Sequence, residues 1–228
     1  MLPRVLEPEV MDTAEEASDS DAMDHRAVNA RFCEDLLAEG AVGPAVLDIG
    51  TGTALIPIEL CRRSPDVRVV AIDLAEHMLA IAARNVTEAR LQDRVMLERA
   101  DAKGLPYPTG AFQTVLSNSI IHHIPDPDET LAEIHRVTAR GGLVFVRDLL
   151  RPADEAELDR LVALYEGTPP DEPRARASWE NQRALLRASL HAALTVEEVA
   201  AAARNAGMTG DVVRRTSDRH WTLAFRKP

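Results

Sequence analysis

Short apolar runs alternate with segments of helical periodicity along the middle of the chain. Apolar residues recur at helical spacing near residues 54–63, 76–90 and 128–138, which predicts helices there. The alternation is typical of βαβ units, so we expect an α/β fold with a doubly wound parallel sheet, right-handed crossovers and helices on both faces. The predicted strands are the β-rich runs Ala45–Ile49, Arg68–Ile72, Val95–Leu97, Thr114–Ser117 and Leu143–Arg147.

Helical segments also precede and follow this central part. An acidic stretch at the start leads into an amphipathic helix that we expect to stop at Gly40. The later part is expected to hold a helix over 152–166, a proline-rich loop over 168–173, a helix from an N-cap at Ser178 to 193, a helix capped by Thr195, and an antiparallel pair formed by Asp211–Arg215 and His220–Phe225.

A single domain accounts for the length of 228 residues. Within it we expect a helical arm (1–40), a ligand-binding core (41–150), a helical insertion that could form a lid (151–193), and a last helix with a closing strand pair (194–228).

Charge and composition narrow the possible partners. With 26 Lys plus Arg against 37 Asp plus Glu, the net charge is −11, which disfavours nucleic acids and anionic membranes as partners. Two cysteines cannot form a disulfide framework, and the chain shows neither a signal-peptide h-region nor an apolar run long enough for a membrane helix. We therefore expect a cytoplasmic protein, monomeric or homodimeric, whose partner is a small molecule.

The first strand ends in a glycine-rich turn within AVLDIGTGTA. Gly50 and Gly52 allow a sharp turn and a close backbone approach to a ligand. A dinucleotide site needs a third glycine where this chain has Leu55, and Asp48 would oppose a diphosphate but suits a ligand with an ammonium and a sulfonium. No Gly-Lys-Ser/Thr follows, which excludes a P-loop. The turn therefore favours S-adenosylmethionine over NAD.

Two further acids end the next two strands. Asp73 follows Gly52 at the spacing expected for a carboxylate that accepts hydrogen bonds from ribose hydroxyls. Asp101 ends the third strand and could accept a hydrogen bond from an adenine amino group. Each acid alone is as easily explained by turn chemistry. Together with the glycines they predict a nucleoside site.

These motifs resemble those of class I, Rossmann-like S-adenosylmethionine-dependent methyltransferases over about residues 40–150. The matching segments are Leu47 to Thr53, Asp73-Leu74, Asp101-Ala102, Leu105 to Pro108, Asn118 to Pro127, and Gly141-Gly142. The sequence departs from the family pattern at Ala54, Gln113 and Ala139 to Gly142. The resemblance implies a seven-stranded sheet with an antiparallel last strand, and S-adenosyl-L-methionine as cofactor. It also implies cofactor contacts at Asp48, Gly50, Thr51, Gly52, Asp73, Leu74, Met78, Asp101, Ala102 and Asn118.

The segment SNSIIHHIPDP places two histidines just past the fourth strand. Because strands four and five should be neighbours, Asp148 at the end of the fifth could orient an imidazole as a general base. We expect His123, ahead of His122, to form this pair with Asp148. A general base at this position would favour oxygen as the methylated atom. A structural role for the histidines stays open. A metal site made of His122, His123, Asp148 and His191 is the weaker alternative, so no metal ligand is assigned.

Residues that recognise the acceptor are expected outside the core. The lid hypothesis for 151–193 rests on Tyr165, Trp179, Arg183 and Arg187, although leucines at helical spacing there equally indicate core packing. Arg147 could pair with an acceptor carboxylate, although a structural ion pair is the stronger interpretation. The alternatives to oxygen methylation are transfer to nitrogen, sulfur or carbon by proximity alone, a cofactor-binding protein without catalysis, and a Rossmann oxidoreductase.

Overall fold

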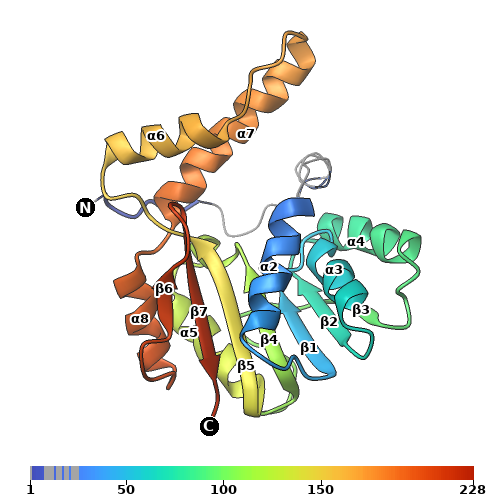
Figure 1. Ribbon diagram of the computed structural model, residues 1–228. Coiled ribbons are helices and arrows are strands. Elements are labelled where there is room, and N and C mark those ends of the chain that lie inside the picture. The colour runs from blue at the N-terminus through green and yellow to red at the C-terminus, as the bar shows by residue number, and fades with distance from the viewer. Residues whose placement is uncertain (1, 8–12, 14–16, 18–20, 22–25) are drawn as a thin grey trace.

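The computed structural model describes residues 2–7, 13, 17, 21 and 26–228. Their central feature is a seven-stranded sheet with the order β3-β2-β1-β4-β5-β7-β6. Strands β1 to β5 run parallel, whereas β7 lies antiparallel between β5 and β6 (Figure 1). The strands are β1 (Ala45–Ile49), β2 (Arg68–Asp73), β3 (Val95–Arg99), β4 (Phe112–Asn118), β5 (Thr138–Leu149), β6 (Val213–Arg215) and β7 (His220–Arg226). The predicted doubly wound sheet and its antiparallel end are confirmed.

Helices cover both faces of the sheet because the side chains of each strand alternate between two apolar cores. Val46 of β1 packs with α2, α3 and α4 in one core, while its neighbour Leu47 packs with α5 and α8 in the other. The helices are α2 (Arg26–Ala38), α3 (Leu55–Arg63), α4 (Glu76–Glu88), α5 (Pro127–Val137) and α8 (Val196–Asn205). The predicted cap of α8 at Thr195 is present and forms a capping box, with Thr195 and Glu198 each bonded to the other's backbone N–H.

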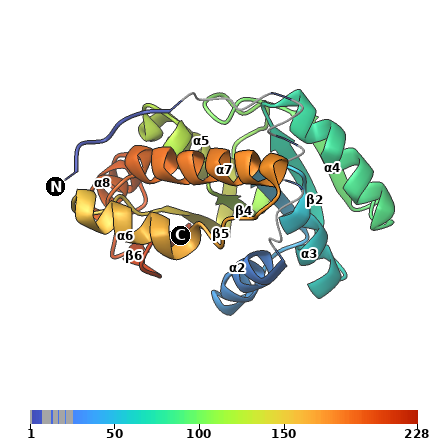
Figure 2. The same cartoon turned by 90° about the horizontal axis from the view of Figure 1, so that it is seen from above.

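Two more helices lie above the edge where the parallel strands end. Viewed from above, α7 (Pro173–Ala192) runs across this edge with α6 (Glu155–Tyr165) beside it (Figure 2). Leu158 and Leu161 of α6 and Leu190 of α7 form a third, smaller apolar core, which Leu2 of the N-terminal segment joins. Packing, one of the two interpretations, therefore accounts for these leucines, whereas Leu164 and Leu185 of the same pattern are exposed.

Several boundaries differ from those expected from the sequence. Helix α7 begins at Pro173 rather than after Ser178, because a proline is tolerated in the first turn, where its missing N–H has no helical partner. Strand β5 begins at Thr138, so that Gly141 and Gly142 lie within it. A Cβ on Gly142 would lie 2.8 Å from the carbonyl oxygen of Ala139, which explains a glycine inside this strand.

No helix in the described ranges is long and apolar enough to cross a membrane.

Candidate active site

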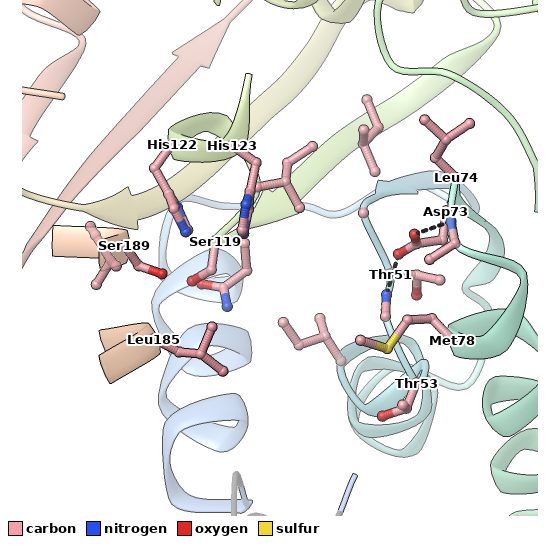
Figure 3. A pocket seen from close by; sticks show the side chains of 18 of the residues that line it. Thr51, Thr53, Asp73, Leu74, Met78, Ser119, His122, His123, Leu185 and Ser189 are labelled. Carbon is pink, nitrogen blue, oxygen red and sulfur yellow. Dashed lines mark hydrogen bonds between the residues drawn. The ribbon is translucent and has the colours of Figure 1, made fainter. Parts of the chain in front are cut away.

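A cavity of about 1060 Å³ opens at the carboxyl ends of β1, β2 and β4, the edge where ligands of open α/β sheets bind. Its two ends differ in chemistry (Figure 3). Asp73, Leu74 and Met78 lie at one end, and the rings of His122 and His123 lie at the other. Of the predicted cofactor-binding residues, all except Asp48 line it: Gly50, Thr51, Gly52, Asp73, Leu74, Met78, Asp101, Ala102 and Asn118.

The glycine turn after β1 forms the floor of this cavity. Gly50 and Gly52 have φ angles of 71° and 54°, a region that suits glycine. The backbone N–H groups of Gly50 and Thr51 both donate to the carbonyl of Ile72, at 2.9 Å. Ala54, which stands where the family often has a third glycine, adopts the same left-handed conformation with φ 62°. The turn thus keeps its shape despite this departure.

Asp73 fixes the turn from the neighbouring strand. One carboxylate oxygen accepts from the backbone N–H of Gly52 at 2.8 Å, and the other accepts from that of Ala75 at 2.9 Å. These bonds hold the carboxylate at the end of β2 beside the cavity, where its remaining acceptor positions could meet ribose hydroxyls.

Asp101 lines the same end from the loop after β3. Its carboxylate accepts from the backbone N–H of Lys103 and lies 3.1 Å from the ammonium nitrogen of Lys103. Burial raises the pKa of Asp101, but both contacts with Lys103 outweigh that effect, so that the pKa falls below its usual value. The carboxylate is thus kept ionised and able to accept a hydrogen bond.

Asp48 lies beneath the turn rather than on the cavity wall. Its side chain is fully buried, and its Oδ2 atom has no hydrogen-bond partner among the described residues. Burial raises the pKa of Asp48 to about 7, the nearby charge of Asp73 adds to the rise, and the Thr51 hydroxyl opposes it. A cationic ligand near this end of the cavity would stabilise the ionised carboxylate.

Replacing Asp48 with asparagine is expected to stabilise the ligand-free protein at pH 8. The pKa of Asp48 is about 7 in the folded protein and 3.8 for an ordinary aspartate, so the folded protein binds this proton more tightly than the unfolded chain does. The free energy of unfolding of the wild-type protein therefore falls as the pH rises from 3.8 to about 7. At 1.36 kcal/mol per pKa unit, the variant should gain about 2–4 kcal/mol at pH 8 and little near pH 4. Thermal unfolding of both proteins across this pH range checks the prediction. A gain independent of pH would contradict it.

The opposite end of the cavity contains a histidine–aspartate pair. Asp148 is fully buried at the end of β5 and accepts hydrogen bonds from the backbone N–H groups of Ile121 and Leu149, at 2.5 and 2.6 Å. Its Oδ1 lies 2.5 Å from Nδ1 of His122, so in the neutral imidazole the ionised carboxylate holds the proton on Nδ1 and leaves the lone pair on Nε2. Burial lowers the pKa of His122, but Asp148 outweighs it and raises the pKa above its usual value.

The structure corrects which histidine forms this pair. We expected His123 to contact Asp148, but the imidazole that does so is that of His122, which is 3% exposed. The reason is the short 3₁₀ helix η1 (Ile121–His123), which turns consecutive side chains in different directions. His123 lies next to it, with ring centroids 4.2 Å apart, and also lines the cavity. Asp148 itself does not line the cavity, and His122 lies between its carboxylate and the cavity.

Glu7 contacts both histidines at this end, although it does not itself line the cavity and the sequence gives it no role. Its Oε1 atom lies 3.4 Å from Nε2 of His122 and 3.3 Å from Nδ1 of His123. Ser189 of α7 donates a hydrogen bond to the same oxygen at 3.0 Å. No signal in the sequence marks Glu7, because it belongs to an irregular segment far from the histidines along the chain.

Helix α7 covers the histidine end of the cavity. Tyr165 and Glu166 at the end of α6 also line it. Helix α7 contributes seven lining residues: Asn181, Gln182, Arg183, Ala184, Leu185, Leu186 and Ser189. Of the four residues behind the lid hypothesis, Tyr165 and Arg183 line the cavity, Trp179 donates to the Glu166 carbonyl, and Arg187 pairs with Glu155 and Asp159.

Arg147 is held by contacts within the protein. It is 9% exposed, and its guanidinium donates to the Asp35 carboxylate of α2 at 2.8 Å and to the hydroxyl of Thr222 at 3.0 Å. The structural ion pair is therefore the interpretation that the structure supports.

Comparison with known proteins identifies the family. The family model described as a methyltransferase domain matches residues 46–142, the segment that holds the glycine turn and the acids. The structure of an S-adenosylmethionine-dependent methyltransferase from Aquifex aeolicus superposes with a TM-score of 0.68 and 18% identity, over 94% of this chain and 98% of that one. At this identity the likeness shows the shared fold.

Two curated relatives are closer in sequence. The demethylmenaquinone methyltransferase of Thermus thermophilus is 37% identical over 107 residues, which are 47% of this chain and 48% of the relative. The phosphatidylethanolamine N-methyltransferase of Cereibacter sphaeroides is 31% identical over 160 residues, 69% of this chain and 73% of the relative. This chain spans less than half the length of several other curated relatives. The chain belongs to the S-adenosylmethionine-dependent methyltransferases.

The residues present fit the cofactor of this family. The unpartnered carboxylate oxygen of Asp48 lies at the end where a ligand ammonium would be stabilised. A Cβ on Gly52 would meet no atom within 4 Å, so the backbone there leaves open space beside the cavity. Asp73 would hold the ribose, with Leu74 and Met78 beside the base.

Proposed function

We propose that this protein methylates a small-molecule acceptor, with oxygen favoured as the methylated atom. The observation that carries the proposal is the pair formed by His122 and Asp148. His122 lines one end of the cavity, and the residues that fit the cofactor line the other end. The relatives are named for a quinone and a phospholipid amine, which supports a small-molecule or lipid acceptor but leaves the acceptor atom to be decided by this cavity.

The chain's own residues would act by binding, orientation and proton removal. When bound, S-adenosylmethionine supplies a methyl group on a sulfonium, which is already a good leaving group. The protein therefore has mainly to align the acceptor and exclude water, and α7 covers the acceptor end. Nε2 of His122 would take the proton of an acceptor hydroxyl while Asp148 fixes the tautomer. An amine or a thiolate acceptor would need only the alignment.

Calorimetric titration with S-adenosylhomocysteine tests the cofactor part of the proposal. We expect a dissociation constant in the micromolar range and no binding of NADH, because Leu55 replaces the third glycine of a dinucleotide site. A screen of hydroxyl, amine and thiol acceptors with labelled methyl groups then identifies the acceptor class. Binding of NADH without binding of S-adenosylhomocysteine would favour the oxidoreductase alternative. Cofactor binding without turnover on any acceptor would favour a non-catalytic protein.

A further inference from the structure

We propose that Glu7, His122 and His123 form a binding site for one divalent transition-metal ion at the acceptor end of the cavity. The three side chains offer one carboxylate oxygen and two imidazole nitrogens, and these ligand atoms lie within 4.8 Å of one another. One carboxylate and two imidazoles are a common ligand set for Zn²⁺ and for non-haem iron. The inference rests on the proposed function, because it concerns how the same acceptor is activated.

The spacing of the ligand atoms suits an ion. Zn²⁺ binds imidazole nitrogen and carboxylate oxygen at about 2.0–2.1 Å, so two ligands at a tetrahedral angle lie about 3.4 Å apart. The two distances from Oε1 of Glu7 are 3.4 Å to Nε2 of His122 and 3.3 Å to Nδ1 of His123. Two edges of the tetrahedron are therefore formed already, and three protein ligands leave the fourth position to water or another small ligand.

The surrounding residues orient the ligands as they do around metal sites. A histidine that binds a metal ion usually donates its second ring N–H to a carboxylate, which fixes the tautomer and raises the basicity of the coordinating nitrogen. Asp148 accepts from Nδ1 of His122 at 2.5 Å, so that Nε2 faces Glu7. Ser189 donates to the carboxylate of Glu7, whose side chain is 7% exposed.

The N-terminal segment is anchored in a way that places Glu7 at the histidines. Arg4 donates from Nε to the carbonyl of Ala192 at 2.7 Å and from Nη2 to that of Ile124 at 2.8 Å. The backbone N–H of Leu2 bonds to Ala153, and that of Val5 bonds to His191. These contacts tie the segment to the end of α7 and to the loop after η1, so that the carboxylate does not depend on an ion for its position.

The weaker metal site considered from the sequence used different ligands. In the structure Asp148 occupies Nδ1 of His122, and Nε2 of His191 lies 3.4 Å from Glu155. Glu7 replaces both as the third ligand. An acceptor hydroxyl that binds at the open position would lose its proton to solvent, because coordination to a divalent ion lowers the pKa of a bound hydroxyl. His122 would then serve as a ligand instead of the base, and the ion would act only by lowering the pKa of the hydroxyl whose proton solvent takes up.

Metal titration of the untagged, chelator-treated full chain tests the site. We expect one Zn²⁺ per chain, at least tenfold weaker binding in both Glu7→Gln and His123→Asn, and no change in His77→Asn, which alters an exposed histidine of α4. Co²⁺ should give the visible absorption of a tetrahedral site in the wild-type protein, and Glu7→Gln should lose it. Mg²⁺ should bind far more weakly, because it prefers oxygen ligands.

Equal Zn²⁺ binding by Glu7→Gln and His77→Asn, or less than one ion per wild-type chain, would overturn the proposal. Titration of the same samples with S-adenosylhomocysteine separates this result from the proposed function. If the wild-type protein binds S-adenosylhomocysteine but not Zn²⁺, only the metal site is refuted. If the wild-type protein does not bind S-adenosylhomocysteine, the proposed function is refuted. Retained cofactor binding by the Glu7→Gln variant also shows that it is folded.

Discussion

Replacing His122 with asparagine should lower the turnover number for a hydroxyl acceptor about 10²–10⁴-fold, the usual contribution of a positioned acid–base group. The imidazole is buried, and its Nε2, the ring nitrogen that does not contact Asp148, is the atom that we propose takes the proton of the acceptor. The affinity for S-adenosylhomocysteine should stay within about twofold, because the cofactor residues lie at the other end of the cavity. Initial rates with labelled methyl groups and calorimetry of the same variant check both expectations.

His135→Asn provides a matched control for this experiment. His135 is a half-buried imidazole on α5 that packs against Phe225, away from the residues that line the cavity. Its replacement should leave the turnover number unchanged. If His122→Asn retained the wild-type rate with a hydroxyl acceptor, the role given to the histidine–aspartate pair would be wrong, and transfer by proximity alone would be favoured.

Alanine substitutions at the two glycines of the turn should both lower stability, more strongly at Gly50, whereas the main loss at Gly52 should be in cofactor binding. A Cβ on Gly50 would lie 2.0 Å from Cγ2 of Ile120, and the φ angle of 71° is unfavourable for alanine. Together the overlap and the left-handed backbone should lower the free energy of unfolding by about 2–4 kcal/mol. Thermal unfolding should show this as a drop of several degrees in Tm.

Gly52→Ala should instead cost about 1–2 kcal/mol, because its Cβ meets no atom within 4 Å and only the backbone conformation is strained. That Cβ would occupy open space beside the cavity, so the variant should remain folded and lose most of its affinity for S-adenosylhomocysteine. The double variant Gly50→Ala/Ile120→Ala removes the overlapping methyl group and should recover part of the stability lost in Gly50→Ala. Wild-type cofactor affinity in Gly52→Ala would show that the cofactor does not approach this turn.

The cofactor end of the site could be predicted from the sequence because its signals are local. Gly50, Gly52 and Asp73 lie at the ends of strands whose apolar patterns are clear, and the carboxyl ends of parallel strands meet at one edge of the sheet. The turn and the acids therefore come together wherever the strands pair in that order. The sequence predicted a cofactor contact at Asp48, and only the structure shows that it does not line the cavity and has an oxygen without a hydrogen-bond partner among the described residues.

The acceptor end depended on contacts between segments far apart in the chain. The sequence indicated that Asp148 would meet one of two adjacent histidines, because neighbouring strands bring those loops together. Which imidazole points at the carboxylate depends on the turn of η1, which apolar periodicity does not encode.

The sequence by itself thus determined the order and type of most elements, the class of the fold and the cofactor turn, since each follows from short-range pattern and strand-end chemistry. Tertiary structure alone decided the acceptor end of the site, because long-range packing assembles it. Arg147 is bound to Asp35 of α2, and Glu7 reaches the histidines because Arg4 and Leu2 anchor an irregular segment to α7 and the α6 region. Such contacts join residues more than a hundred positions apart, and no periodicity along the chain records them.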